Sequence, residues 1–140
     1  MAAGTPSLQM GKGLPSLAER MKVVNGFEFG RNYLVPGRKG YLTRRRLTKE
    51  FQGFTHVHLE HDSTGKLYRM TFSDEIRLAS DEEIRKRFDG VLEYLKTTFG
   101  MEFNRRVSSG NCSTDYFEDG VKVVVNASKS GVSLLIENRR

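Results

Sequence analysis

The chain has 140 residues, of which 37% are hydrophobic and 29% charged, and its net charge at pH 7 is +6. This length and composition suit one globular domain with a single core and exclude an intrinsically disordered chain. The sequence contains no run of 18 apolar residues, which excludes a membrane-spanning helix. The single cysteine, Cys112, cannot form an internal disulfide, so cysteine usage leaves the compartment open.

The first twenty residues contain glycine and proline among small polar side chains, a composition that resists regular structure. We expect a flexible tail over residues 1–20, with one short helical turn capped by Ser16 and Glu19, and a single domain over residues 21–140. The first ten residues lack the basic start and apolar stretch of a secretory signal. Two locations therefore stay open: the cytoplasm, or an extracytoplasmic site if a signal sequence was removed and part of the tail derives from a vector.

The first β-type pattern covers residues 23–29, which read VVNGFEF. The alternation is imperfect and Gly26 interrupts it, so we predict one strand with a bulge at this glycine. Residues 35–40 combine proline with glycine, which is typical of a turn. A second strand is then expected to begin near Tyr41.

A hairpin is predicted between residues 54 and 72. Two β-type runs, 54–59 and 67–72, flank a polar connector that contains Gly65, and its length suits an antiparallel pair. In the second run alternate residues share one face, which we expect to be buried. These residues are Tyr68, Met70 and Phe72.

The clearest pattern is a helix that begins after Ser80, which is expected to cap it in a capping box with Glu83. Apolar side chains recur at helical spacing until Gly100, which supplies the stop. Gly90, inside the helix, is interpreted as a point of close approach to a sheet. The apolar stripe consists of Ile84, Phe88, Val91, Leu92, Leu95 and Phe99.

Two more strands are predicted over residues 121–126 and 132–137, where β-branched residues alternate with polar ones. They are expected to form a C-terminal hairpin. Together these segments predict an α+β fold: an antiparallel sheet of four to six strands, with one long amphipathic helix packed on one face to form two layers.

Three segments, GFEFG, GKLYRMTF and IRKRFDGVLEYLKTTFG, precede the terminal hairpin in this order. This order resembles a class of small uncharacterised bacterial α+β domains, in which an early FG motif precedes a gKLy strand and a helix that ends in an aromatic residue and glycine. The resemblance covers residues 23–137. It implies no activity and no catalytic residues, but it favours an extracytoplasmic location, because such relatives are often exported or lipid-anchored.

All three histidines lie within residues 56–61. On a strand, His56 and His58 would point to one face about 7 Å apart, which suits two metal ligands, and His61 or Asp62 could complete the site from the turn. A tight zinc site needs a third or fourth ligand, and no further one stands at a motif spacing. We therefore favour the alternative, a solvent-facing strand whose histidines pair with their neighbours.

Positive charge is densest between residues 38 and 49. Cationic side chains neutralise phosphates and aromatic rings stack on bases, so this patch is a candidate for single-stranded nucleic acid, with Tyr41, Phe51 and Phe54 as stacking residues. A solvated strand face explains the pattern equally well, and strand alternation would place Arg45 on the opposite face from its neighbours. The patch consists of Arg38, Lys39, Arg44, Arg45, Arg46 and Lys49.

The sequence contains no phosphate-binding glycine loop, dinucleotide fingerprint or nucleophile elbow. We therefore predict a non-catalytic binding module that needs no cofactor and contacts a partner protein or another anionic macromolecule. Two alternatives stay open: a nucleic-acid-binding domain that uses Arg44 to Arg46, which is not favoured, and a metal-dependent enzyme centred on His56 and His58.

Overall fold

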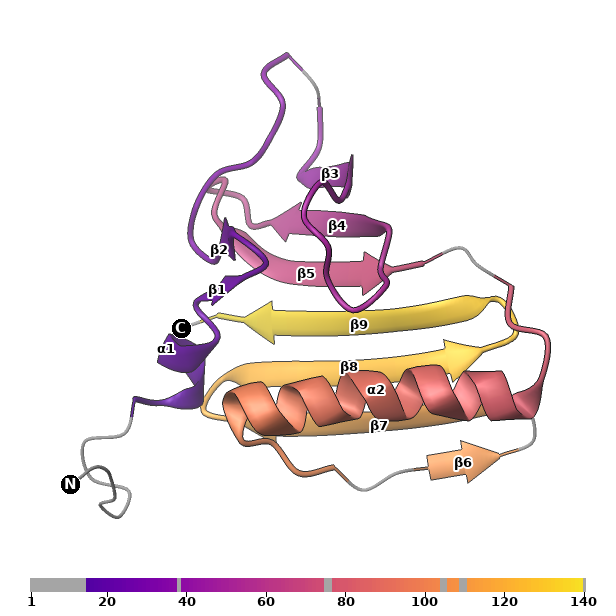
Figure 1. Cartoon of the computed structure of the whole chain (residues 1–140). Coiled ribbons are helices and arrows are strands. Elements are labelled where there is room, and N and C mark those ends of the chain that lie inside the picture. Colours follow the sequence, from indigo (N-terminus) through magenta and orange to yellow (C-terminus); the bar gives the residue numbers. More distant parts are fainter. Residues whose placement is uncertain (1–14, 38, 75–76, 104–105, 109–110, 140) are drawn as a thin grey trace.

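The computed structural model describes residues 15–37, 39–74, 77–103, 106–108 and 111–139, with only the backbone described at 106–108. The helices and strands follow one another as shown in Figure 1. They are α1 (Leu17–Arg20), β1 (Val23–Val24), β2 (Phe27–Glu28), β3 (Leu42–Arg46), β4 (His56–His61), β5 (Leu67–Ser73), α2 (Asp81–Phe99), β6 (Arg106–Ser108), β7 (Asn111–Glu118), β8 (Val121–Ser128) and β9 (Gly131–Asn138).

Seven strands form one antiparallel sheet in the order β3-β4-β5-β9-β8-β7-β6. Helix α2 connects β5 to β6 and packs on β7, β8 and β9, after which β9 returns to pair with β5 in the middle of the sheet. Figure 1 shows the helix lying along one half of the sheet. The predicted α+β fold, with one long helix on an antiparallel sheet, is confirmed, and the short strand β6 brings the sheet to seven strands.

The core forms between α2 and the inner face of the sheet. On β8 and β9 every second residue is buried, as the alternation in the sequence predicted. The register places Val123 beside Ile136 and Val125 beside Leu134, so these side chains pack as neighbouring pairs. Burying each large apolar side chain contributes about 1.5–3 kcal/mol before the loss of chain entropy, so this hairpin is a main source of stability.

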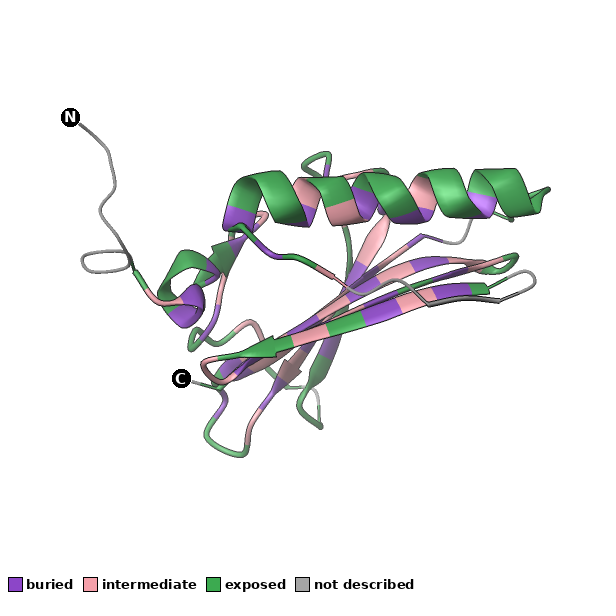
Figure 2. Ribbon diagram, turned by 90° about the horizontal axis from the view of Figure 1, so that it is seen from below, coloured by how far each residue is buried: buried purple, intermediate pink, exposed green. Residues whose placement is uncertain are grey.

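Helix α2 follows the predicted pattern except in its capping box, because the side chain of Glu83 accepts a hydrogen bond from the N–H of Ala79 at 2.7 Å in place of the predicted one from Ser80. Ser80 accepts a hydrogen bond from the backbone N–H of Glu83 at 3.2 Å, and Gly100 ends the helix in a left-handed conformation. Figure 2 shows the buried residues of the helix on the side that faces the sheet. Gly90 is exposed and a Cβ there would meet no atom, so the interpretation of this glycine as a close-approach point is wrong. The buried stripe consists of Ile84, Phe88, Val91, Leu95 and Phe99, while Leu92 is half-buried.

The connection between β3 and β4 covers the half of the sheet that α2 leaves open (Figure 1). Phe51 packs edge-on against Phe72 of β5, with 4.7 Å between ring centroids. Arg87 of α2 fixes this connection, because its guanidinium donates to the C=O of Gln52 at 2.6 Å and to the buried carboxylate of Asp74 at 2.5 Å. The connection is therefore part of the core structure.

The N-terminal helical turn at Ser16 is confirmed with its capping box. Leu17 and Met21 are fully buried, and the side chain of Asn138 donates to the C=O of Ala18 at 3.0 Å. The described part of the expected tail therefore belongs to the domain, which begins before residue 21. Residues 1–14 lie outside the described residues.

Strands β1 and β2 correct a third expectation. The prediction of one strand bulged at Gly26 is wrong, because Val24 pairs with Phe27 in a tight hairpin. Asn25 and Gly26 both have positive φ, at 52° and 85°, as a type I′ turn requires. The Asn-Gly pair was a visible hairpin signal that the broken alternation obscured.

Candidate binding surface at strand β3 and the outer sheet face

The sheet face that points away from α2, called the outer face here, carries mostly polar side chains. They alternate with the buried residues along each strand, and the described ones are exposed or half-buried. The register between neighbouring strands arranges these side chains in rows across the sheet. The first row is Leu42, Glu60, Arg69, Glu137, Lys122 and Phe117; the second is Arg44, His58, Thr71, Leu135, Val124 and Asp115; the third is Arg46, His56, Ser73, Ser133, Asn126 and Ser113.

The glutamates of the first row are held in ion pairs. Arg69 lies between them, 2.9 Å from a carboxylate oxygen of Glu60 and 2.9 Å from one of Glu137, and Arg139 donates to Glu137 at 3.0 Å. Burial raises the pKa of Glu137, but hydrogen bonds from Arg139 and Arg69 outweigh it and hold the pKa below its ordinary value. Both carboxylates are therefore held in ion pairs with arginine, and these contacts favour the ionised form of Glu137.

The other two rows begin with four cationic or titratable side chains at one corner of the outer face. The register places Arg44 opposite His58 and Arg46 opposite His56, and residues directly opposite have Cβ atoms about 4.5–5.5 Å apart. Both arginines are exposed and both histidines are half-buried. We call these four residues the basic corner.

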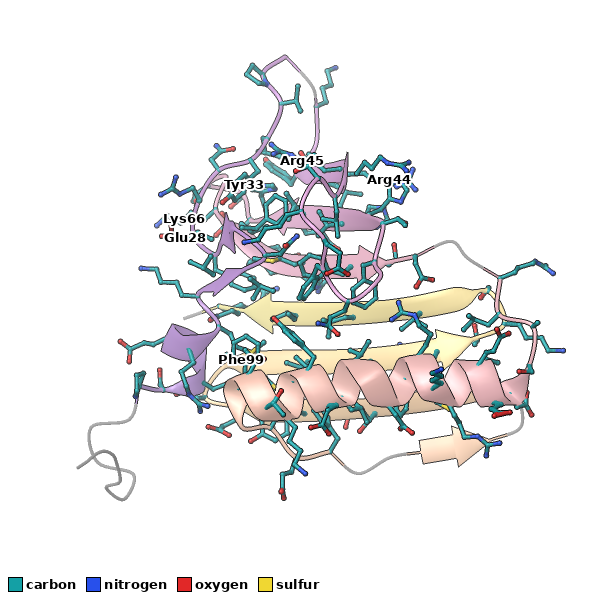
Figure 3. All side chains as sticks on the ribbon, in the orientation of Figure 1. Glu28, Tyr33, Arg44, Arg45, Lys66 and Phe99 are labelled. Carbon is teal, nitrogen blue, oxygen red and sulfur yellow. The ribbon has the colours of Figure 1, made fainter. Side chains whose placement is uncertain are left out.

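Arg45 lies on the other face of β3, as strand alternation predicted. Its guanidinium lies 5.4 Å from the centre of the Tyr33 ring and donates to the C=O of Tyr33 at 3.4 Å. Figure 3 shows Arg45 beside Tyr33 and Arg44 pointing away from both. Lys39 and Lys49 are exposed in the connections that flank β3, whereas Arg38 lies outside the described residues. The structure therefore divides the predicted patch between two faces.

His61 is separated from the other two histidines. It is buried, while His56 and His58 lie on the outer face. Its Nε2 accepts a hydrogen bond from the N–H of Tyr33 at 3.0 Å, so Nδ1 carries the proton and donates to the C=O of Tyr41 at 2.9 Å. Both ring nitrogens thus hold the backbone of the preceding loop, and neither is available to a metal ion.

No metal centre is evident in the part of the chain that the structure describes. Within it, no three His, Cys, Asp or Glu side chains come together in a way that could hold an ion. Nδ1 of His56 lies 2.9 Å from the hydroxyl of Thr55, which gives this histidine a local hydrogen bond. The Cys112 thiol is buried.

The aromatic residues near the basic patch do not form the stacking surface that the sequence suggested. Phe51 and Phe54 are buried in the core, on the opposite side of the sheet from His56 and His58. Tyr41 is 53% exposed and stands immediately before β3. Of the three rings proposed to stack on bases, only Tyr41 can reach a ligand.

A pocket of about 260 Å³ lies beside β3, between the strand and the preceding loop. No pattern in the sequence predicts this pocket, because its shape depends on how the loop folds back beside the strand. The only signal in the sequence was the short apolar pair Leu34 and Val35 before a turn. The lining residues are Leu34, Val35, Lys39, Gly40, Leu42, Thr43, Arg44 and Arg45.

Comparison with known proteins finds no matching family model, no matching curated protein and no matching solved structure. Among the described residues, no helix is both long and apolar enough to cross a membrane.

Proposed function

We propose that this protein is a non-catalytic binding module that holds an anionic macromolecule against the basic corner. The observation that supports this proposal is the register of β3 and β4, which sets Arg44 opposite His58 and Arg46 opposite His56. These side chains stand on a sheet face that α2 does not cover. Adjacent cationic groups on an uncovered sheet face favour a negatively charged ligand.

The charge balance of the outer face supports the same proposal. Glu60 and Glu137, the carboxylates of the first row, are paired with Arg69 and Arg139. These ion pairs largely cancel the negative charge of the two carboxylates, so it does little to reduce the positive potential at the basic corner. Lys39 and Lys49 add exposed positive charge on either side of β3.

The metal-dependent enzyme is the weaker candidate. His61 would have to leave two backbone hydrogen bonds to act as a third ligand, and each such buried group costs about 1–3 kcal/mol when it loses its partner. His56 and His58 lie on an open face, whereas reaction sites are usually concave pockets that exclude water.

Heparin, a sulfated polyanion, provides a test that is independent of the partner's identity. We expect the protein to bind heparin at low salt, and Arg44→Ala/Arg46→Ala to weaken this binding about tenfold, since each exposed charge contact contributes up to about 1 kcal/mol. The control is Lys86→Ala/Lys129→Ala, which removes the same charge from exposed positions elsewhere. Equal weakening by both variants, or no binding at low salt, would contradict the proposal.

A further inference from the structure

Strand β3 forms one edge of the sheet. It spans five residues and pairs with β4, and no strand in the described part of the chain pairs with its other side. The edge of an antiparallel sheet presents backbone N–H and C=O groups that can accept a further strand. This edge is therefore a candidate site for an extended segment.

The hydrogen-bond pattern shows which residues present their backbone at this edge. Just before β3, the C=O of Tyr41 accepts a hydrogen bond from the N–H of His61 at 2.8 Å. Just after β3, the N–H of Leu47 donates to the C=O of Thr55, also at 2.8 Å. Antiparallel pairing alternates, so odd-numbered residues between them direct their backbone toward β4 and even-numbered residues direct theirs toward the edge. The even-numbered residues are Leu42, Arg44 and Arg46, whose side chains lie on the outer face.

The pocket of about 260 Å³ opens beside the same edge. Val35, on its loop wall, is 42% exposed, and Leu42, on its strand wall, is 59% exposed. Exposed apolar side chains around a concavity favour an apolar group of a ligand. In an added strand, side chains alternate between the outer face and the side of Thr43 and Arg45, and residues of both sides of β3 line the pocket.

Charge decides which segment fits. A second copy of this chain would bring one arginine-rich β3 against another, and like charges on neighbouring strands destabilise their pairing. Single-stranded nucleic acid would need stacking rings, and Phe51 and Phe54 are buried. An acidic protein segment satisfies both the cationic side chains and the backbone edge.

We propose that β3 accepts an extended acidic segment of a partner protein as an additional strand. Acidic side chains of the segment lie opposite Arg44 and Arg46 on the outer face, and the alternate apolar side chains enter the pocket beside Val35. This inference rests on the proposed function, since it names the chemical class of the anionic partner.

The probe is a fluorescein-labelled eight-residue peptide in which Glu and Val alternate, measured by fluorescence anisotropy at low salt. In an antiparallel added strand, residues that exchange hydrogen bonds with Arg44 and Arg46 stand directly opposite them, so the N–H groups of the glutamates bond to the edge. N-methylation of the glutamates is expected to weaken binding at least about tenfold, because several hydrogen bonds of about 1 kcal/mol are lost. N-methylation of the valines is the matched control and should have a much smaller effect.

A variant of the protein tests the same edge. Leu42→Pro removes one edge-facing N–H, and proline is tolerated on edge strands. We expect this variant to bind the peptide at least about fivefold more weakly, while its affinity for heparin is retained. Thermal unfolding would verify that the fold is intact.

The outcomes separate the two proposals. If both methylated peptides bind as tightly as the parent, strand addition is wrong, although an anion-binding corner still stands. If a single-stranded oligonucleotide of equal charge binds at least tenfold more tightly than the parent peptide, the partner is a nucleic acid and the acidic segment is wrong. If peptide, oligonucleotide and heparin all fail to bind at low salt, the proposed function fails as well.

Discussion

The backbone N–H of Tyr33 donates a hydrogen bond to Nε2 of His61, with 3.0 Å between the two nitrogens. The opposite ring nitrogen donates to the C=O of Tyr41 at 2.9 Å. One buried imidazole therefore holds both ends of the loop that forms a wall of the pocket beside β3. The stability of this loop and the shape of the pocket depend on the same side chain.

Replacing this imidazole should destabilise the domain. His61→Ala leaves the N–H of Tyr33 and the C=O of Tyr41 without their buried partners, so we expect the free energy of unfolding to fall by about 2–4 kcal/mol. Urea denaturation measures this change. His58→Ala, on the outer face, is the control and should cost less than about 1 kcal/mol. Equal losses in both variants would contradict the structural role of His61.

The same histidine shows what sequence patterns could and could not predict. The spacing of His56 and His58 correctly placed both on one strand face. His61 was expected in the turn because the predicted strand ended at residue 59, whereas β4 runs to His61 and alternation turns this side chain to the other face. Its hydrogen bonds to backbone groups could not be predicted, because these groups belong to residues 28 and 20 positions earlier. Contacts of this kind depend on tertiary folding.

Strand prediction succeeded where apolar alternation was strong and failed where it was weak, with one exception at the start of β5. There the register shifts beside Glu60 and His61, so Leu67 is buried and Tyr68, predicted on the buried face, is only half-buried. Residues 121–126 and 132–137 were identified because β-branched side chains fill the buried positions. Strand β7 was missed, since the buried positions of its first half hold Cys112 and Thr114, residue types with a weak preference for strands. The ladder with β8 compensates for this weak local preference.

The pKa of Glu137 predicts a pH dependence of stability. Its pKa in the folded protein lies below the ordinary value of 4.5, because the hydrogen bonds from Arg139 and Arg69 outweigh the effect of burial. Ionised Glu137 therefore favours the folded state above about pH 4.5, and this contribution is lost as the pH falls through the lowered pKa. We expect Glu137→Gln to lower the free energy of unfolding by about 1 kcal/mol at pH 7 and by much less at pH 3. A difference that stays constant across this range would contradict the prediction.

Replacing glycine with alanine should have opposite effects on stability at two positions, Gly90 inside α2 and Gly100 at its end. Gly90 is exposed in the helix interior with open space around its missing Cβ, so Gly90→Ala should raise the free energy of unfolding by up to about 1 kcal/mol. Gly100 has a φ of 74°, which alanine adopts only with strain, so Gly100→Ala should lower the free energy by about 1 kcal/mol. Thermal or urea unfolding would detect both. Destabilisation by Gly90→Ala would show that this position has a constraint that its open surroundings do not reveal.

Neighbouring arginines on β3 should contribute differently to anion binding. Arg46 lies on the outer face beside His56, whereas Arg45 lies on the other face over the ring of Tyr33. Both substitutions remove one charge from an exposed residue of the same strand, so they are matched in net charge and differ in face.

We expect Arg46→Ala to weaken heparin binding about threefold to fivefold and Arg45→Ala to weaken it less than about twofold, as measured by titration at constant low salt. Because Arg45 also contacts Tyr33, its loss should lower the free energy of unfolding by about 0.5–1 kcal/mol, which Arg46→Ala should not do. Equal weakening of binding by the two variants would mean that the ligand responds to the total charge of β3, and the outer face would lose its role as the binding surface.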